Sequence, residues 1–139
     1  MIENFSSYFL PQQEFFLDKI HYQHKEKLST VENYALTSTD TITVKKIDNN
    51  RLAVFATRNL QFSPDDLFEL SVTFCVVLTL ADPEKAKQDF DGVDLAVEFS
   101  RNGQFALANI FTRLSSLIAN ITASYGQPPI MTPPVFVQV

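Results

Sequence analysis

The stretch FALANIFTRLSSLIANITASY, residues 105–125, sets the architecture expected for the whole chain. Its large apolar residues recur at steps of three and four, which predicts a helix with one broad apolar side. From Gly103 to Val139 the only formally charged side chain is Arg113. A helix on the surface of a monomer needs a charged outer face, so we expect this one to lie between its own sheet and a second subunit. The apolar side comprises Leu107, Ile110, Phe111, Leu114, Leu117, Ile118 and Ile121.

The opposite side of this helix carries small, uncharged residues. A row of small residues allows another backbone to approach closely, so this side predicts the contact between subunits. Arg113 is expected at the rim of that contact, or paired with an acidic residue across it. The expected interface residues are Ala108, Thr112, Arg113, Ser115, Ala119 and Thr122.

Upstream of the helix, alternating residues predict a four-stranded antiparallel sheet that is covered on one side. The clearest alternation runs from Leu67 to Leu80, and the apolar face of the preceding strand is interrupted only by Arg58. Three polar residues at 48–50 predict a hairpin turn, and the irregular pattern of the first strand predicts a bulge. The expected strands are Glu14–Leu28, Thr41–Ile47, Leu52–Phe62 and Leu67–Leu80.

A helical crossover and an extended tail are expected around the long helix. Asp82 as N-cap, followed by Pro83, opens a short helix that Gly92 interrupts. The helix resumes over Val93–Asn102 and stops at Gly103. The segment Gln127–Val139 contains four prolines and several apolar residues, so it should lie extended across a surface. The fold class is therefore α+β, and a chain of 139 residues with 45% hydrophobic residues predicts a single domain spanning 1–139.

Charge and cysteine content narrow the classes of function. A net charge of −5 without a cluster of basic residues argues against nucleic acid as a partner. The helix contains Asn109, Arg113 and Asn120, which make it too polar to insert into a membrane. The amino end lacks the basic region of a secretory signal. Cys75 is the single cysteine, so no internal disulfide can form, and we expect a core residue in a cytoplasmic protein.

No catalytic, metal or cofactor site is expected. His21 and His24 face opposite ways on a strand and lack a suitable third ligand. The acidic stretch from Asp82 to Glu98 lacks the ligand spacing of a calcium loop, so we interpret it as a solvated helix face, with a docking patch for a basic partner as the alternative. Three separated glycines cannot build a phosphate-binding loop, and no nucleophile motif is present.

The order of these elements, together with LSSLIANITASYGQPPIMTPPVF at 114–136, resembles the SecB family of protein-export chaperones. The resemblance implies a SecB-like two-layer fold and a non-enzymatic, ATP-independent chaperone. It also implies a homotetramer built as a dimer of dimers, with the long helices between the sheets and apolar grooves that bind non-native polypeptides. The family adds a second helix after this tail and a basic, zinc-docking end, which the sequence up to Val139 does not show. Relatives of the family also serve as chaperones of antitoxins, so clients of either kind are expected.

Aromatic residues next to the crossover, the helix and the tail are the candidates for a peptide-binding groove. They flank these elements instead of lying within the apolar stripe, although a core position remains the alternative for each. The expected groove residues are Phe90, Phe99, Phe105, Tyr125 and Phe136. The alternative function is a non-catalytic oligomeric adaptor that binds one defined protein partner, and an enzyme on the same scaffold ranks third.

Overall fold

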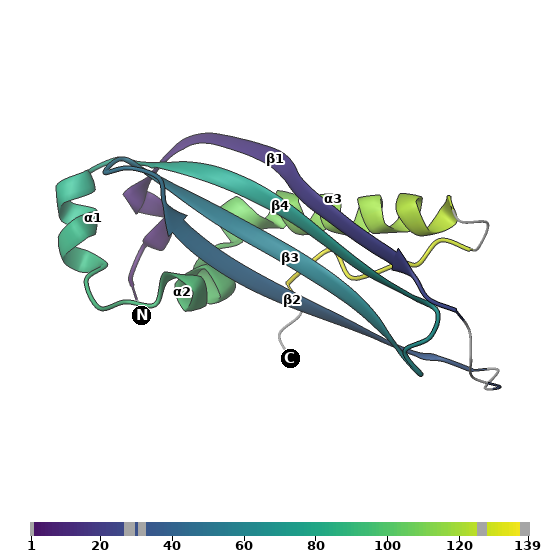
Figure 1. Ribbon diagram of the computed structural model, residues 1–139. Helices are drawn as coiled ribbons and strands as arrows, with labels where there is room; N and C mark the ends of the chain where they lie inside the picture. Colours follow the sequence, from purple (N-terminus) through teal and green to yellow (C-terminus); the bar gives the residue numbers. More distant parts are fainter. Residues whose placement is uncertain (1, 27–29, 31–32, 125–127, 137–139) are drawn as a thin grey trace.

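A four-stranded antiparallel sheet with a long helix across one face forms the framework of the protein (Figure 1). The computed structural model describes residues 2–26, 30, 33–124 and 128–136. The sheet order is β1-β4-β3-β2, so β1 and β2 are the two edges. The chain therefore has the α+β class and the sheet-and-helix arrangement predicted from its sequence. The elements are η1 (Phe5–Tyr8), β1 (Phe9–His24), β2 (Ala35–Lys46), β3 (Arg51–Ser63), β4 (Phe68–Leu80), α1 (Pro83–Asp89), α2 (Leu95–Asn102) and α3 (Gln104–Ala123).

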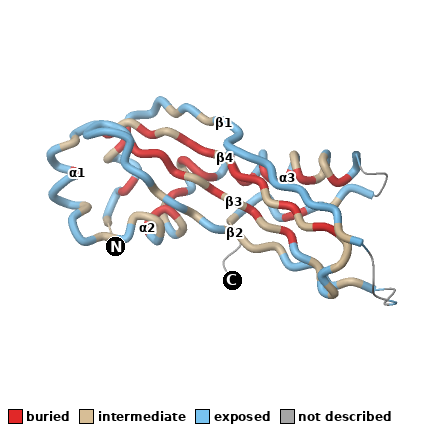
Figure 2. Tube along the Cα trace, viewed as in Figure 1, coloured by how far each residue is buried: buried red, intermediate tan, exposed pale blue. Residues whose placement is uncertain are grey.

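The core lies between α3 and the inner face of the two central strands. Figure 2 shows the buried residues concentrated along β3, β4 and one side of α3, whereas β1 and β2 are mostly exposed. Ile110, Leu114 and Ile118 of the predicted apolar stripe are fully buried. Burying each of these side chains contributes about 1.5–3 kcal/mol, so the stripe holds the helix on the sheet.

The predicted strands are present, but the two edge strands begin earlier than expected. β1 begins at Phe9 instead of Glu14, and its predicted bulge is confirmed by a register shift between Leu17 and Lys19. Residues 27 and 28, the expected end of that strand, lie outside the described residues. β2 begins at Ala35 instead of Thr41. Its first half is polar and gives no apolar alternation, yet it pairs residue by residue with β3.

Capping residues determine where the two helices of the crossover begin. The Asp82 side chain accepts a hydrogen bond from the Lys85 backbone N–H at 3.2 Å, which confirms the predicted N-cap of α1. Asp94, which was not expected as a cap, does the same for α2, so this helix begins at Leu95. Gly103 separates α2 from α3, and a Cβ placed there would lie 2.3 Å from the Phe99 carbonyl oxygen. Only glycine permits so close a turn between the two helices.

The described part of the tail, residues 128–136, runs back along α3 in the opposite direction (Figure 1). The Ile130 N–H donates to Thr122 Oγ1 at 2.8 Å near the end of the helix. Ser115 Oγ donates to the Thr132 carbonyl at 2.5 Å farther back, and Phe136 packs against Phe111 with ring centroids 5.8 Å apart. For residues 128–136 the prediction of an extended tail pinned across a surface is confirmed, whereas residues 127 and 137–139 of the predicted tail lie outside the described residues.

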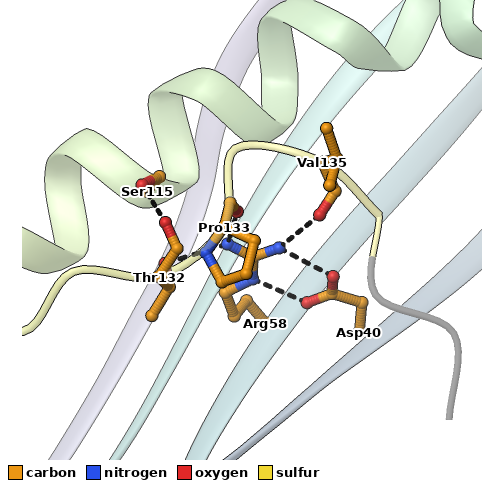
Figure 3. A network of polar contacts seen from close by, with 6 residues as sticks. All are labelled: Asp40, Arg58, Ser115, Thr132, Pro133 and Val135. Atoms are coloured by element: carbon orange, nitrogen blue, oxygen red, sulfur yellow. Dashed lines mark hydrogen bonds and ion pairs between the residues drawn. The ribbon is translucent and has the colours of Figure 1, made fainter.

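Arg58, the one interruption in the apolar face of β3, lies fully buried beneath this tail (Figure 3). Asp40 is directly opposite it on β2. The guanidinium donates through Nε to Asp40 Oδ1 at 2.7 Å and through Nη2 to Asp40 Oδ2 at 2.8 Å. Its carbon lies 5.4 Å from the centre of the Phe111 ring. A bidentate pair of this kind supplies charge neutralisation inside the core.

Arg58→Met is expected to lower the free energy of unfolding by about 3–5 kcal/mol, because it leaves the buried Asp40 carboxylate without its counter-charge. Arg51→Met is the matched control, since Arg51 pairs with Asp48 at the exposed surface and such pairs contribute about 1 kcal/mol or less. Urea unfolding followed by circular dichroism measures both. Equal losses in the two variants would contradict the structural role of the buried pair.

Candidate functional site

A hollow with a volume of about 640 Å³ lies between the inner face of β2 and the helical crossover. Its apolar walls come from three strands and from the helices. Charged and polar side chains of both signs, among them Lys46, Lys87, Asp91 and Asp94, also line it. The apolar walls favour an occupant with apolar side chains. Because the charged lining residues have both signs, they favour neither an acidic nor a basic occupant. The apolar lining residues are Ile42, Val44, Leu52, Leu80, Ala86, Phe90, Val93, Leu95 and Ala96.

The strand beside this cavity is an edge of the sheet. β2 pairs with β3 on one side and has no strand neighbour on the other within the described residues. An edge strand can hydrogen-bond an added extended segment through its free main-chain groups. Ile42 and Val44 of this strand line the cavity at the same time. The arrangement therefore offers main-chain pairing and an apolar pocket next to each other.

Phe90 is the predicted groove residue that lines the cavity, where it is half-buried. Phe99 is 1% exposed and belongs to the core, so here the core alternative holds. Phe105 is half-buried and joins Phe90 and Phe99 in one aromatic cluster around Phe5. The centroids of these rings lie 5.8, 4.8 and 5.9 Å from that of Phe5 for Phe90, Phe99 and Phe105 respectively.

The other two predicted groove residues are not part of this cluster. Phe136 is half-buried in the tail and packs against Phe111 in the first half of α3. Tyr125 lies outside the described residues. The aliphatic lining from β2 was not predicted, although the alternation Thr41-Ile42-Thr43-Val44 places Ile42 and Val44 on one face of the strand. That alternation was the signal available in the sequence.

The predicted interface residues on α3 divide into two groups. Ser115 and Thr122 are buried in the single chain, because the tail covers them and bonds to their hydroxyl groups. Ala108, Thr112 and Arg113 are exposed, and Ala119 is half-buried. The Arg113 guanidinium lies 5.0 Å from the centre of the Phe15 ring on β1. Contact with a second subunit stays a prediction for the six interface residues on α3.

Exposed apolar side chains also lie along the edge strand β1. Leu17, Ile20 and Tyr22 are 43%, 44% and 37% exposed. They lie opposite Phe74, Val72 and Leu70 in the register with β4, and therefore on the helix-bearing side of the sheet. This edge of the sheet is thus apolar and has no strand beyond it among the described residues.

Several of the titratable residues singled out in the sequence contact neighbouring side chains. His21 Nε2 lies 3.2 Å from Glu69 Oε1 at the surface, and no three His, Cys, Asp or Glu side chains in the described ranges gather to hold a metal ion. Asp89, which belongs to the acidic stretch, accepts a hydrogen bond from the Tyr8 hydroxyl at 2.5 Å, and this hydrogen bond raises the pKa of Tyr8. Glu98 differs from the expected solvated face, because it is only 7% exposed.

Comparisons with known proteins can now be set beside this geometry. No family model and no curated protein matches the sequence. The SecB-like chaperone of Mycobacterium tuberculosis, solved in complex with a ChAD peptide from the HigA1 antitoxin, superposes with a TM-score of 0.57 over 86% of each chain at 12% sequence identity. This chain has the SecB-like fold. A Streptococcus agalactiae protein of unknown function, with 14% identity over 88% of this chain and 95% of its own, reaches a TM-score of 0.40 and carries no argument.

None of the helices in the described part of this SecB-like fold combines the length and apolar character needed to cross a bilayer. Cys75 lies fully buried within the sheet. Burial raises the pKa of its thiol to about 11. The thiol is therefore neutral and inaccessible at physiological pH, which fits the expected role of a core residue and not that of a nucleophile.

Cys75 should react with Ellman's reagent at pH 8 about 100-fold more slowly in the native protein than in urea, because both access and the thiolate fraction are low in the folded state. The absorbance of the released chromophore measures both rates. Rapid reaction of the native protein with one equivalent of reagent would contradict the buried placement.

Proposed function

We propose that this protein is an ATP-independent chaperone that binds non-native polypeptides in the cavity beside β2. The observation that carries the proposal is the cavity of about 640 Å³, with largely apolar walls, that is lined by Ile42 and Val44 of the edge strand β2. Ligand cavities commonly measure roughly 300–1,000 Å³, so it can accept several apolar side chains of a bound segment. The SecB-like fold supports this assignment.

The chemistry of an unfolded client matches this site. A non-native chain exposes apolar side chains and main-chain groups that have no hydrogen-bond partner. The free edge of β2 can pair with those main-chain groups, while the cavity takes the side chains on the adjacent face. Both interactions depend weakly on sequence, which suits a chaperone with many clients. They require no nucleotide, and the three glycines of the chain form no phosphate-binding motif.

A single buried cysteine suits a reducing compartment, so we place this activity in the cytoplasm. The M. tuberculosis neighbour was solved with an antitoxin peptide, which supports polypeptide clients, and we propose clients of export or antitoxin type. The same observation favours the alternative, a non-catalytic adaptor for one defined partner. An adaptor should bind one natural protein stoichiometrically and ignore unrelated unfolded chains.

Self-assembly forms part of the proposed function. Ala108 and Thr112 leave the outer side of α3 exposed and almost uncharged, and Ile20 marks the apolar stripe along the β1 edge. A second copy would cover both surfaces, and two such pairs would form the dimer of dimers that the SecB resemblance implies. The cavity beside β2 lies at the opposite edge of the sheet from β1, so assembly through β1 leaves it open.

Purified protein should suppress aggregation of a chemically denatured protein without nucleotide, and Ile42→Lys should weaken client binding about tenfold or more, because it places a charge in the apolar cavity. Thr41→Lys is the matched control, since its side chain projects from the opposite face of the same strand. Light scattering measures aggregation, and thermal melting verifies folding of both variants. No suppression by the unmodified protein at severalfold excess would contradict the chaperone proposal.

Light scattering in solution should give a mass that is a multiple of the 15.7 kDa chain, with four copies expected. Ala119→Arg and Ile20→Glu should each reduce that mass, because each places a charge on the surface that a second copy would cover. Gln23→Glu is the control on the outer face of β1. A monomeric unmodified protein would refute the assembly.

A further inference from the structure

The guanidinium of Arg58 forms the centre of a binding site for main chain (Figure 3). Its five N–H donors are all engaged, two by Asp40 and three by the tail. The tail acceptors are Thr132 Oγ1 at 2.9 Å, the Pro133 carbonyl at 2.5 Å and the Val135 carbonyl at 2.8 Å. Asp40 therefore orients the guanidinium, and the remaining donors point toward an extended segment.

Two hydroxyl groups of α3 complete the site. Ser115 Oγ donates to the Thr132 carbonyl, and Thr122 Oγ1 accepts from the Ile130 N–H. Of the five polar contacts made to the tail, four reach its main chain and one reaches the Thr132 side chain. We call Asp40, Arg58, Ser115 and Thr122 the main-chain clamp. It recognises an extended backbone with little dependence on the side chains that the backbone carries.

The side chains of the tail contribute unevenly to its binding. Met131 is 75% exposed and Val135 is 60% exposed, whereas Ile130 and Phe136 pack against the core. Residues 128–136 carry no charge and contain four prolines, which favour an extended backbone and reduce the entropy lost on ordering. In composition and conformation the tail therefore resembles an extended segment of a non-native polypeptide.

The clamp is continuous with the cavity beside β2. Val44 and Ile42 line the cavity, and Asp40 is the next residue with the same orientation on that strand. Two residues of a strand span about 7 Å, so the two sites are adjacent along β2. A client held in the cavity reaches the clamp with a few further residues.

A buried ion pair does little for stability that apolar residues of similar volume could not do. The side chains of Arg58 on β3 and Asp40 on the edge strand β2 are nevertheless fully buried. An apolar pair at these positions would hold the two strands together without offering directed donors to carbonyl oxygens. The hydrogen bonds from Arg58 to the main chain of the tail explain why an ion pair occupies these positions.

We propose that the main-chain clamp is a second binding site for extended, uncharged polypeptide, and that the tail is its resident occupant until a client displaces it. The proposal rests on the chaperone function proposed above. A tethered tail competes at an effective concentration of roughly millimolar, so a short peptide cannot readily replace it. A long client that also fills the cavity gains a second set of contacts and can replace it.

A fluorophore on Met131→Cys reports the state of the tail, because Met131 is exposed and the native Cys75 is buried. The full-length protein is titrated with reduced, carboxamidomethylated ribonuclease A, a soluble chain that stays unfolded. Fluorescence anisotropy of the tail label should fall as the client binds. A label on Gln88→Cys in α1 serves as the control and should show no fall.

Thr132→Val removes the hydrogen bond that the tail side chain accepts from Arg58 Nη1 and leaves the four clamp residues unchanged. Client affinity should rise about threefold, since a single hydrogen bond contributes that order of binding. Ser100→Ala is the matched control, because this hydroxyl bonds the Val97 carbonyl within α2 and does not contact the tail. Its client affinity should equal that of the unmodified protein.

The outcomes separate the two proposals. Client binding with an unchanged tail signal, or a Thr132→Val variant with a looser tail and no gain in affinity, overturns the displacement and leaves the chaperone function standing. Failure of the unfolded chain to bind any of these proteins overturns the chaperone function and the displacement together. A falling tail signal with tighter binding by Thr132→Val is the result expected.

Discussion

A buried positive charge constrains how the rest of this chain can fold. Arg58 carries its guanidinium into the layer between the sheet and α3, where it is fully shielded from solvent. Leaving such a charge unpaired costs several kcal/mol. Asp40 on β2 supplies the counter-charge, and the tail supplies the remaining acceptors. Sheet, helix and tail must therefore close around Arg58 together, and the place of the tail follows from that requirement.

The regular elements could be predicted from the sequence because their periodicity is strong, but the position of the tail on the helix and the sheet could not. The row of small residues on α3 indicates that another backbone approaches, without saying whose. At Ser115 and Thr122 it is the backbone of the same chain. The first half of β2 was missed for a related reason, since its polar residues are held by pairing with β3 and by Arg58 instead of by apolar burial.

The candidate site shows a similar division. Choosing aromatic residues identified Phe90, which lines the cavity, but also Phe99, which is buried around Phe5. No periodic pattern links Phe5 to the helices, so the sequence could not show that this residue fills the aromatic cluster. The aliphatic wall from β2 together with the free strand edge gives the SecB-like fold a surface suited to extended polypeptide. The clamp beneath the tail adjoins that surface through Asp40 on the same strand.

Nuclear magnetic resonance of the Arg58 side chain tests the central claim most directly. If the guanidinium binds Asp40 and the tail as described, its Nε and Nη protons should give separate, slowly exchanging signals. Those signals should show nuclear Overhauser effects to residues 132–135. A single averaged Nη signal that exchanges rapidly with solvent and shows no effect to the tail would contradict the account.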